Sequence, residues 1–352
     1  MDVAIGLGRY SITDYDETLS WVLEAERLGV ESVWSAEAWE HDGVTPLAYL
    51  AAKTERIKFG TGILQVGTRT PALLAMTAMS MHQLSGGRFK LGLGTSGPQV
   101  IEGWHGVRFD RPVTRTREII EIVRKVMRGE LLEYSGTLYE LPLPGGEGKA
   151  IRSNAPPTPE LPIYIASLGP KNLHLTGEIA DGWLGTSFAP GSAETFLGPL
   201  RAGAEAAGRS LADLDLHAGG TVWFTDDVEE AARQLRGGLA FSLGAMGSRR
   251  HNFYNDAYVR QGYADEAKEI QRLWIEGRRD EARERVPLEM VTDMNLIGTP
   301  EMVKQRLREY RDAGITTFRP GLRGETLAER VEALGQLMEL VSEVSAEATA
   351  TV

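Results

Sequence analysis

Short apolar segments alternate with amphipathic helical patterns along almost the whole chain, and this alternation is the feature that most constrains the fold. Residues 3–7, for example, are apolar, and the helical stripe that follows has Asp14 to cap it and Gly29 to end it. The apolar segments are continuous rather than alternating, which is typical of parallel strands covered by helices on both faces. The segments expected as strands are 3–7, 32–36, 57–64, 89–94, 163–166, 183–185, 217–224 and 316–320.

Each expected strand is followed by a helical pattern, with the seventh helix near 227–238 and the last at about 326–345. Eight such units fit a (β/α)8 TIM barrel better than an open doubly wound sheet. Residues 130–160 are rich in Gly and Pro and predict a small hairpin with an irregular loop, whereas 240–298 predict a helical insertion on the barrel rim, a candidate lid. We therefore expect residues 1–352 to form a single barrel domain that carries both insertions.

Charge and composition exclude several classes of function. The chain has 38 basic and 49 acidic residues, a net charge of −11, which disfavours general binding to nucleic acids or anionic membranes. Cysteine is absent, so disulfides, thiol nucleophiles and iron–sulfur clusters are excluded. The sequence contains no run of 18 apolar residues and no signal-peptide pattern at its start, so we expect a cytoplasmic protein without a membrane anchor.

The residues that follow the expected strands are poor in acids and bases but rich in Gly, Ser and Thr. Ligands of a (β/α)8 barrel bind at this end of the strands. Glycines there allow a backbone to approach a large flat or phosphorylated ligand, and the helix start after Gly169 favours an anion. The alternative is that these are only tight barrel turns. The strand exits in question are 6–9, 36–39, 62–65, 94–97, 166–171, 185–187 and 319–321.

The sequence lacks the familiar motifs of metal sites, nucleotide-binding loops and serine hydrolases. The six His residues are scattered and no HExxH motif occurs, so no metal site is expected. The stretch GLGTSG at 92–97 has glycines spaced as GxGxxG, but it resembles a dinucleotide-binding fingerprint only superficially, because the first strand-to-helix turn of the chain is different. Neither GxxxxGK[ST] nor GxSxG is present, which argues against a P-loop NTPase and a serine hydrolase.

The sequence resembles the bacterial luciferase-like flavin and deazaflavin superfamily, and within it the coenzyme F420-dependent branch that includes methylenetetrahydromethanopterin reductase. The resemblance runs nearly end to end, and its motifs occur in the family's order. They are IKFGTGILQVGTRTPALLAMTAMSMHQLSGGRFKLGLGTSG (57–97), RPVTRTREIIEIVRKVMRGE (111–130), PIYIASLGPKNLHLTGEIADGWLG (162–185), AEAAGRSLADLDL (204–216) and NLIGTPEMVKQRLREYRDAGITTF (295–318).

The resemblance implies a set of cofactor contacts at the strand exits. It implies a cis peptide bond between Gly62 and Ile63, which forms a bulge behind the central ring of the deazaflavin, and a ring contact from Gln65. Glu37 matches an acidic residue at the end of strand 2. The other contacts implied are Thr95, Ser96 and Gly97 after strand 4, Ala166, Ser167, Leu168 and Gly169 after strand 5, Thr186 after strand 6, and the basic residues Lys171 and Arg69 for the phosphodiester and acidic tail of F420.

One departure from the family bears on the reaction. The F420-dependent sugar-phosphate dehydrogenases place a His after the strand-2 acid and a catalytic Glu at strand 4, where this chain has Ala38 and Gly97. The candidate catalytic residues are therefore Glu37 and His41. His41 substitutes for the missing His only if its loop folds inward, and is otherwise a solvated loop residue; Glu37 has the alternative of capping the next helix. The pattern argues against sugar-phosphate oxidation and fits a reductase in which the cofactor does the chemistry.

Taken with the resemblance, these features predict an F420-dependent oxidoreductase that transfers hydride between C5 of the deazaflavin and a small organic substrate, and a homodimer. The alternatives are an FMN-dependent luciferase-like monooxygenase and a non-catalytic flavin-binding relative; a metal-dependent lyase is opposed by the lack of clustered ligands. Substrate contacts are expected from 98–112 and 240–298, where Arg249 and Arg250 are candidates for an anionic group.

Overall fold

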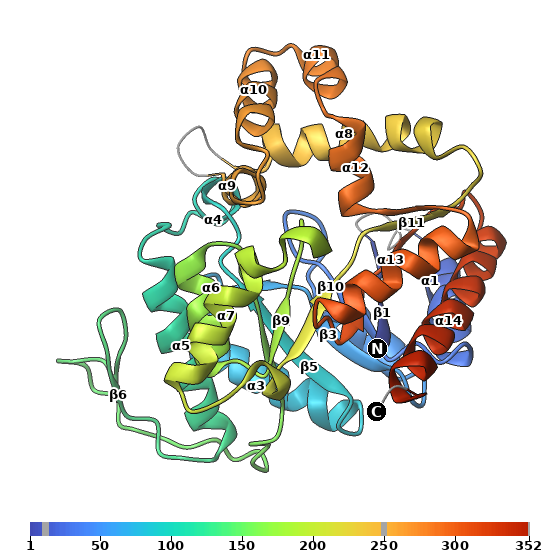
Figure 1. The fold of residues 1–352 in the computed structure, drawn as a ribbon. Coiled ribbons are helices and arrows are strands. Elements are labelled where there is room, and N and C mark those ends of the chain that lie inside the picture. Colours follow the sequence, from blue (N-terminus) through green and yellow to red (C-terminus); the bar gives the residue numbers. More distant parts are fainter. Residues whose placement is uncertain (9–13, 248–251, 351–352) are drawn as a thin grey trace.

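Eight parallel strands close into a barrel in this computed structural model, which describes residues 1–8, 14–247 and 252–350 (Figure 1). Around the barrel the order is β3-β2-β1-β13-β10-β9-β8-β5, and β5 pairs back with β3. The predicted (β/α)8 barrel is therefore confirmed. The barrel strands are β1 (Asp2–Gly6), β2 (Ser32–Ser35), β3 (Lys58–Thr61), β5 (Phe89–Gly94), β8 (Ile163–Ala166), β9 (Gly182–Leu184), β10 (Asp215–Ala218) and β13 (Thr317–Phe318).

A ring of helices covers the outside of the barrel, and the main core lies between the two layers (Figure 1). Asp14 caps the first helix as predicted, because its carboxylate accepts from the backbone N–H groups of Asp16 and Glu17. The ring consists of α1 (Tyr15–Arg27), α2 (Thr45–Ala51), α3 (Pro71–Leu84), α5 (Pro112–Met127), α6 (Pro170–Ile179), α7 (Glu194–Ala206), α13 (Pro300–Asp312) and α14 (Leu327–Ala350).

Two of the expected strands are wrong as single strands. The segment 57–64 divides into β3 and the short β4 (Leu64–Gln65), which pairs with the end of β5. The segment 217–224 divides into β10, inside the barrel, and β11 (Thr221–Phe224), which leaves it. Gly219 lies between β10 and β11, where a Cβ would sit 2.0 Å from the carbonyl oxygen of Arg319. This close backbone contact turns the chain away from the barrel.

The helix after the seventh strand was also wrongly placed, because the helix near 227–238 does not cover the barrel. It is part of α8, which packs with four further helices around a second, separate core. The seventh barrel helix is α13, whose Leu307 and Tyr310 are fully buried in the main core. The second core is formed by α8 (Val228–Ala245), α9 (Phe253–Arg260), α10 (Ala264–Ile275), α11 (Arg279–Glu284) and α12 (Leu288–Met294).

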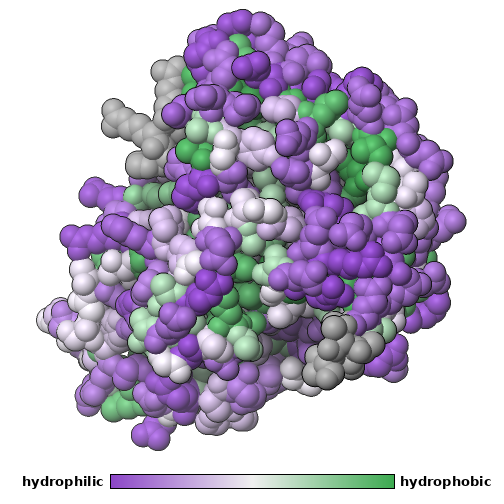
Figure 2. All heavy atoms as spheres, viewed as in Figure 1, coloured by the Kyte–Doolittle hydropathy of each residue, from purple (hydrophilic) through white to green (hydrophobic). Residues whose placement is uncertain are grey.

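These helices form a layer above the barrel, which we call the rim layer (Figure 1). It is enclosed by β11 and β12 (Leu296–Gly298), which pair with each other, and β14 (Gly321–Leu322) completes that small sheet. Figure 2 shows that the outer surface of α10 and α11 is hydrophilic. On α10, Arg272 pairs with Glu269 at 2.7 Å and Glu276 at 2.7 Å, an arrangement suited to contact with solvent.

Residues 130–160 contain the predicted hairpin, formed by β6 (Tyr134–Ser135) and β7 (Glu140–Leu141). A short helix, α4 (Pro98–Ile101), follows β5 at the upper edge of the barrel (Figure 1). Among the residues that the structure describes, no helix combines the length and apolar character needed to cross a lipid bilayer.

Buried charges fill part of the barrel interior. Lys90 on β5 binds Glu31 at 2.8 Å and lies 3.5 Å from Asp215 on β10. Asp215 also accepts hydrogen bonds from Tyr164 at 2.8 Å and contacts His217 Nε2 at 2.8 Å. Burial by itself raises the pKa of Asp215, but its bonds with His217 and Thr316, together with the charge of Lys90, bring that pKa well below the ordinary value. Asp215 is therefore ionised in the folded protein.

We expect Gly92→Ala to destabilise the barrel by about 3 kcal/mol or more, because a Cβ there would lie 1.7 Å from the Thr61 carbonyl oxygen at the seam that closes the sheet. The matched control is Gly238→Ala in α8, where a Cβ meets nothing within 4 Å. Replacing this helix glycine should raise the free energy of unfolding by about 0.5–1 kcal/mol. Urea denaturation of both variants measures the difference. Equal stability of the two would show that the seam tolerates a side chain.

We expect Asp215→Asn to lower the free energy of unfolding by about 3 kcal/mol at pH 7, because Lys90 loses one of its carboxylate neighbours. The pKa of Asp215 is depressed in the folded state, so its contribution is present above the unfolded pKa of about 3.9 and is lost as the pH falls further. Urea titrations at pH 7, 4 and 3 should show the gap between wild type and variant closing below about pH 4. A gap that stays constant with pH would contradict this account.

Candidate active site

The mouth of the barrel lies at the carboxyl ends of its strands, below the rim layer (Figure 1). The peptide bond between Gly62 and Ile63 is cis, as predicted, and it joins β3 to β4. The Ile63 side chain leans over Gly94 at the end of β5, where a Cβ would lie 2.9 Å from Ile63 Cγ1. Ile63 packs with Trp34 and Leu184 in a small apolar cluster inside the barrel. The centre of the mouth is therefore an apolar floor.

Glu37 follows β2 and is held in a two-pronged ion pair with Arg69. Arg69 Nη2 donates to Glu37 Oε2 at 2.7 Å, Nη1 contacts Oε1, and the backbone N–H of Gly43 donates to Oε2 at 2.9 Å. These bonds with Glu37 raise the pKa of Arg69. The Glu37 carboxylate is therefore already neutralised, and Arg69, engaged in this pair, is not available for the acidic tail of a cofactor. The capping role considered for Glu37 belongs to Asp42, which accepts from the first N–H groups at the start of α2.

Gln65 is fully buried and crosses from β4 to the end of β2. Its Nε2 donates to the backbone carbonyl of Glu37 at 2.9 Å, and the Thr68 hydroxyl donates to its backbone carbonyl at 3.2 Å. The side chain thus fastens the loop that carries Glu37. Contact between Gln65 and the ring of a cofactor stays a prediction.

Two serines at the mouth have an unusual backbone conformation. Ser96 after β5 has φ of 54° and Ser187 after β9 has φ of 55°, in the left-handed region that non-glycine residues rarely adopt. Such residues concentrate at ligand sites. The neighbouring Thr95 hydroxyl bonds the Ser96 carbonyl at 3.3 Å, Gly97 begins α4, and Thr186 is exposed. Ser187 was missed because its conformation has no sequence signal.

The exit of β8 presents backbone rather than side chains to the mouth. The Ser167 hydroxyl is buried and bonds Thr176 in α6 at 2.8 Å, so it faces away. Gly169 begins the ten-residue helix α6, and a Cβ there would meet nothing within 4 Å. Exposed Lys171 stands on the first turn of this helix. The carbonyl of Leu168 accepts from Arg260 at 2.7 Å, and Ala166 is partly buried beside the apolar floor.

Arg260 was not among the predicted site residues. It belongs to α9 in the rim layer and reaches the exit of β8, where burial lowers its pKa. The open helix start at Gly169 thus has two basic side chains nearby, Lys171 and Arg260. This combination suits an anionic group such as a phosphodiester. No signal in the sequence connects residue 260 with residue 168.

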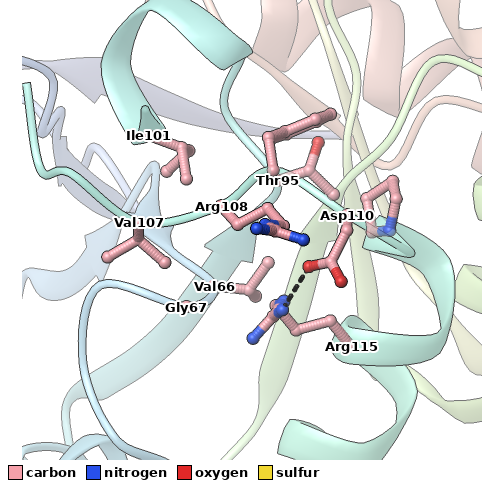
Figure 3. A pocket seen from close by; sticks show the side chains of 10 residues that line it. Val66, Gly67, Thr95, Ile101, Val107, Arg108, Asp110 and Arg115 are labelled. Carbon is pink, nitrogen blue, oxygen red and sulfur yellow. Dashed lines mark hydrogen bonds and ion pairs between the residues drawn. The ribbon is translucent and has the colours of Figure 1, made fainter. Parts of the chain in front are cut away.

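A small pocket lies beside the mouth, between the ends of β4 and β5 and the segment before α5 (Figure 3). Val66 and Thr95 line it, and the side chains of Arg108 and Asp110 point into it. Asp110 is paired with Arg115 at 2.6 Å. The pocket therefore joins predicted site residue Thr95 to part of the 98–112 segment.

The structure does not bring every predicted residue together. Gly62, Ile63, Glu37 and Gln65 form one connected group, whereas His41 is exposed and makes no hydrogen bond to another described residue. Arg249 and Arg250 lie outside the described residues. Within the described part of the chain, no group of three or more His, Asp or Glu side chains is arranged to hold a metal ion.

Residues 3–317 match the family model for luciferase-like monooxygenase. The chain belongs to the luciferase-like monooxygenase family. A protein of Mycobacterium tuberculosis named as a coenzyme F420-dependent oxidoreductase is 39% identical, over 90% of this chain and 93% of that protein. The 5,10-methylenetetrahydromethanopterin reductase of Methanolobus tindarius is 30% identical over 84% of this chain and 87% of its own length.

Among solved structures, the F420-dependent tetrahydromethanopterin reductase from Methanopyrus kandleri has a TM-score of 0.77. The match covers 96% of this chain and 97% of that chain at 23% identity, and it shows that the luciferase-like fold is shared.

We expect Glu37→Gln to lower the free energy of unfolding by about 3 kcal/mol, because it leaves the guanidinium of Arg69 without its counter-charge in a partly buried site. Removal of both partners in the double variant with Arg69→Met should cost less than the sum of the single changes. A double-mutant cycle by urea denaturation measures the coupling, with Arg201→Met at the exposed Glu194 pair as control. Additive single effects would show that the pair does not hold the loop.

Proposed function

We propose that this protein is a coenzyme F420-dependent oxidoreductase that transfers hydride between C5 of the deazaflavin and a small organic substrate. The observation that carries the proposal is the make-up of the mouth. Its centre is an apolar floor with Ile63, its exits offer backbone at Ser96, Gly169 and Ser187, and its nearest carboxylate is neutralised. Such a site provides shape and orientation rather than acid–base catalysis, which suits a cofactor that carries the reaction itself. The M. tuberculosis relative supports the choice of F420.

The residues present fit this cofactor. The flat ring would rest on the floor formed by Ile63, whose side chain lies over the end of β5 because Gly94 has no Cβ. The phosphodiester would lie at the open helix start of Gly169, next to Lys171 and Arg260. When bound, F420 supplies a carbon that accepts or donates hydride.

The protein's own residues orient the reactants and exclude water. Glu37 is a positioning residue in this proposal, because Arg69 and Gly43 occupy its carboxylate and tie down the loop after β2. His41 lies on the same loop, is exposed, and makes no hydrogen bond with another described residue, so we propose it as the group that takes up or delivers a proton when the substrate requires one. The rim layer above the mouth would keep bulk water from the reacting carbon.

The second candidate is an FMN-dependent monooxygenase, which the name of the matching family model favours. The two cofactors differ physically, because the deazaflavin has carbon in place of the flavin N5 and does not react readily with oxygen. A third candidate, a flavin-binding protein without catalysis, shares the site but would show no turnover.

We expect the purified protein to bind F420 with micromolar or tighter affinity and to bind FMN at least tenfold more weakly, as measured by fluorescence titration of each cofactor. Reduced F420 should then be oxidised when a panel of enones, imines and carbonyl compounds is added, followed by absorbance under nitrogen. Binding of FMN without F420 would overturn the proposal in favour of the monooxygenase. Tight F420 binding without oxidation by any member of the panel would favour the non-catalytic protein.

The homodimer, the cytoplasmic location and the single-domain organisation remain predictions. Light scattering on the purified protein measures the first of these, and limited proteolysis of the rim layer tests the last.

A further inference from the structure

Arg319 directly follows β13, the eighth barrel strand, and its side chain turns into the barrel mouth. Its backbone N–H donates to the carbonyl of Ala218 at 2.9 Å, which fixes the residue beside β10. Its guanidinium carbon lies 5.9 Å from the centre of the Trp34 ring. A Cβ placed on Gly62 would lie 3.7 Å from Arg319 Nη2. The guanidinium thus lies between the buried indole and the Gly62–Ile63 link.

Among the described residues, Arg319 makes no ion pair and its side chain makes no hydrogen bond, and burial alone accounts for the change in its pKa. That pKa falls to about 10, so the group remains charged at neutral pH. Arg319 is partly buried, and a cation–π contact at 5.9 Å recovers only a fraction of the hydration that its guanidinium loses. A role limited to supporting Trp34 therefore does not account for this placement.

The charges around Arg319 leave it without a counter-ion. Lys90, from β5, is already paired with Glu31 at 2.8 Å and lies 3.5 Å from Asp215. His217, from β10, is kept neutral because burial lowers its pKa, and the charge of Arg319 lowers it further. Glu37 is already bound to Arg69. We therefore expect the positive charge of Arg319 to interact with a ligand bound in the mouth.

We propose that Arg319 is the charge partner of the deazaflavin ring, and that it stabilises the ring when the ring carries negative charge. This inference rests on the proposed function. The ring of F420 has an acidic hydroxyl, and loss of its proton spreads negative charge through the conjugated tricycle. A fixed guanidinium close to the link behind the ring would favour that anion over the neutral form, as any nearby cation lowers the pKa of an acid.

The location separates this role from phosphate binding. Arg319 is at the end of β13, next to Gly62, whereas the open helix start at Gly169 and its basic neighbours follow β8. Two different anionic parts of one cofactor would thus be met by two different sets of residues. Arg319 lies in the strand exit 319–321 that the sequence indicated, but it was not singled out as a cofactor contact, and Arg260 was not predicted at all.

The test is an absorbance titration of the ring hydroxyl of oxidised F420, free and bound to saturating protein. We expect wild type to lower the apparent pKa of this hydroxyl by about one unit, a tenfold preference for the anion. Arg319→Met should abolish the shift and weaken binding of the anionic ring about tenfold, whereas Arg319→Lys should retain part of both. The matched control is Arg323→Met, because Arg323 also lies over a tryptophan, 4.5 Å from the Trp223 ring, but outside the barrel. It should behave as wild type.

Each outcome decides the inference. If the pKa of the ring hydroxyl is unchanged or raised on wild-type protein, the inference is overturned. This measurement needs no variant, so it decides the inference even if Arg319→Met folds poorly. Equal pKa and affinity for wild type and a folded Arg319→Met, judged by circular dichroism, would overturn the role of Arg319 and leave F420 as the cofactor. Failure of wild type to bind F420 would overturn this inference together with the proposed function.

Discussion

The structure depends on close backbone contact at the seam where β3 meets β5. Side chains are absent at Gly60, Gly92 and Gly94, where a Cβ would overlap Trp34, the Thr61 carbonyl and Ile63 respectively. Because these three positions are bare, Trp34 fills the barrel, the sheet closes, and the chain after β3 leans over the end of β5. The seam that completes the fold therefore also builds the floor of the mouth, so stability and ligand shape depend on the same glycines.

Several charged side chains in the barrel and at its mouth are paired with one another. Inside the barrel Lys90 is balanced by Glu31 and Asp215, and at the mouth Arg69 is balanced by Glu37. These pairs are complete within the protein, so they contribute positioning rather than chemistry. Arg319 differs from them in lacking a carboxylate partner among the described residues. The chain has a net charge of −11, so a cation without a partner at the mouth would attract an anionic ligand that the rest of the protein repels.

Much of the fold could be predicted because its signals are local. The bounds of β5 match the expected strand 89–94, and Asp14 caps α1 as expected, since both signals lie within a few residues of the element. The division at Gly219 was missed although Gly219 and Gly220 interrupt the segment, because the backbone of Arg319 that closes against Gly219 lies a hundred positions away in the chain. The same holds for the site. Strand exits can be recognised from local sequence. The pairing of Glu37 with Arg69 and the hydrogen bond from Arg260 to the Leu168 carbonyl depend on the closed barrel.

The rim layer is fastened to the exits that surround the mouth. Besides the bond of Arg260 to the Leu168 carbonyl, Gln261 at the end of α9 donates to the Ser187 carbonyl at 2.7 Å and accepts from the backbone N–H of Ala189 at 3.1 Å. These bonds reach the exits of both β8 and β9. A change in the rim layer that reshapes a substrate pocket would therefore also be felt at the backbone proposed to hold the cofactor. In the proposed function, these two adjacent residues at the end of α9 would link substrate selection to cofactor binding.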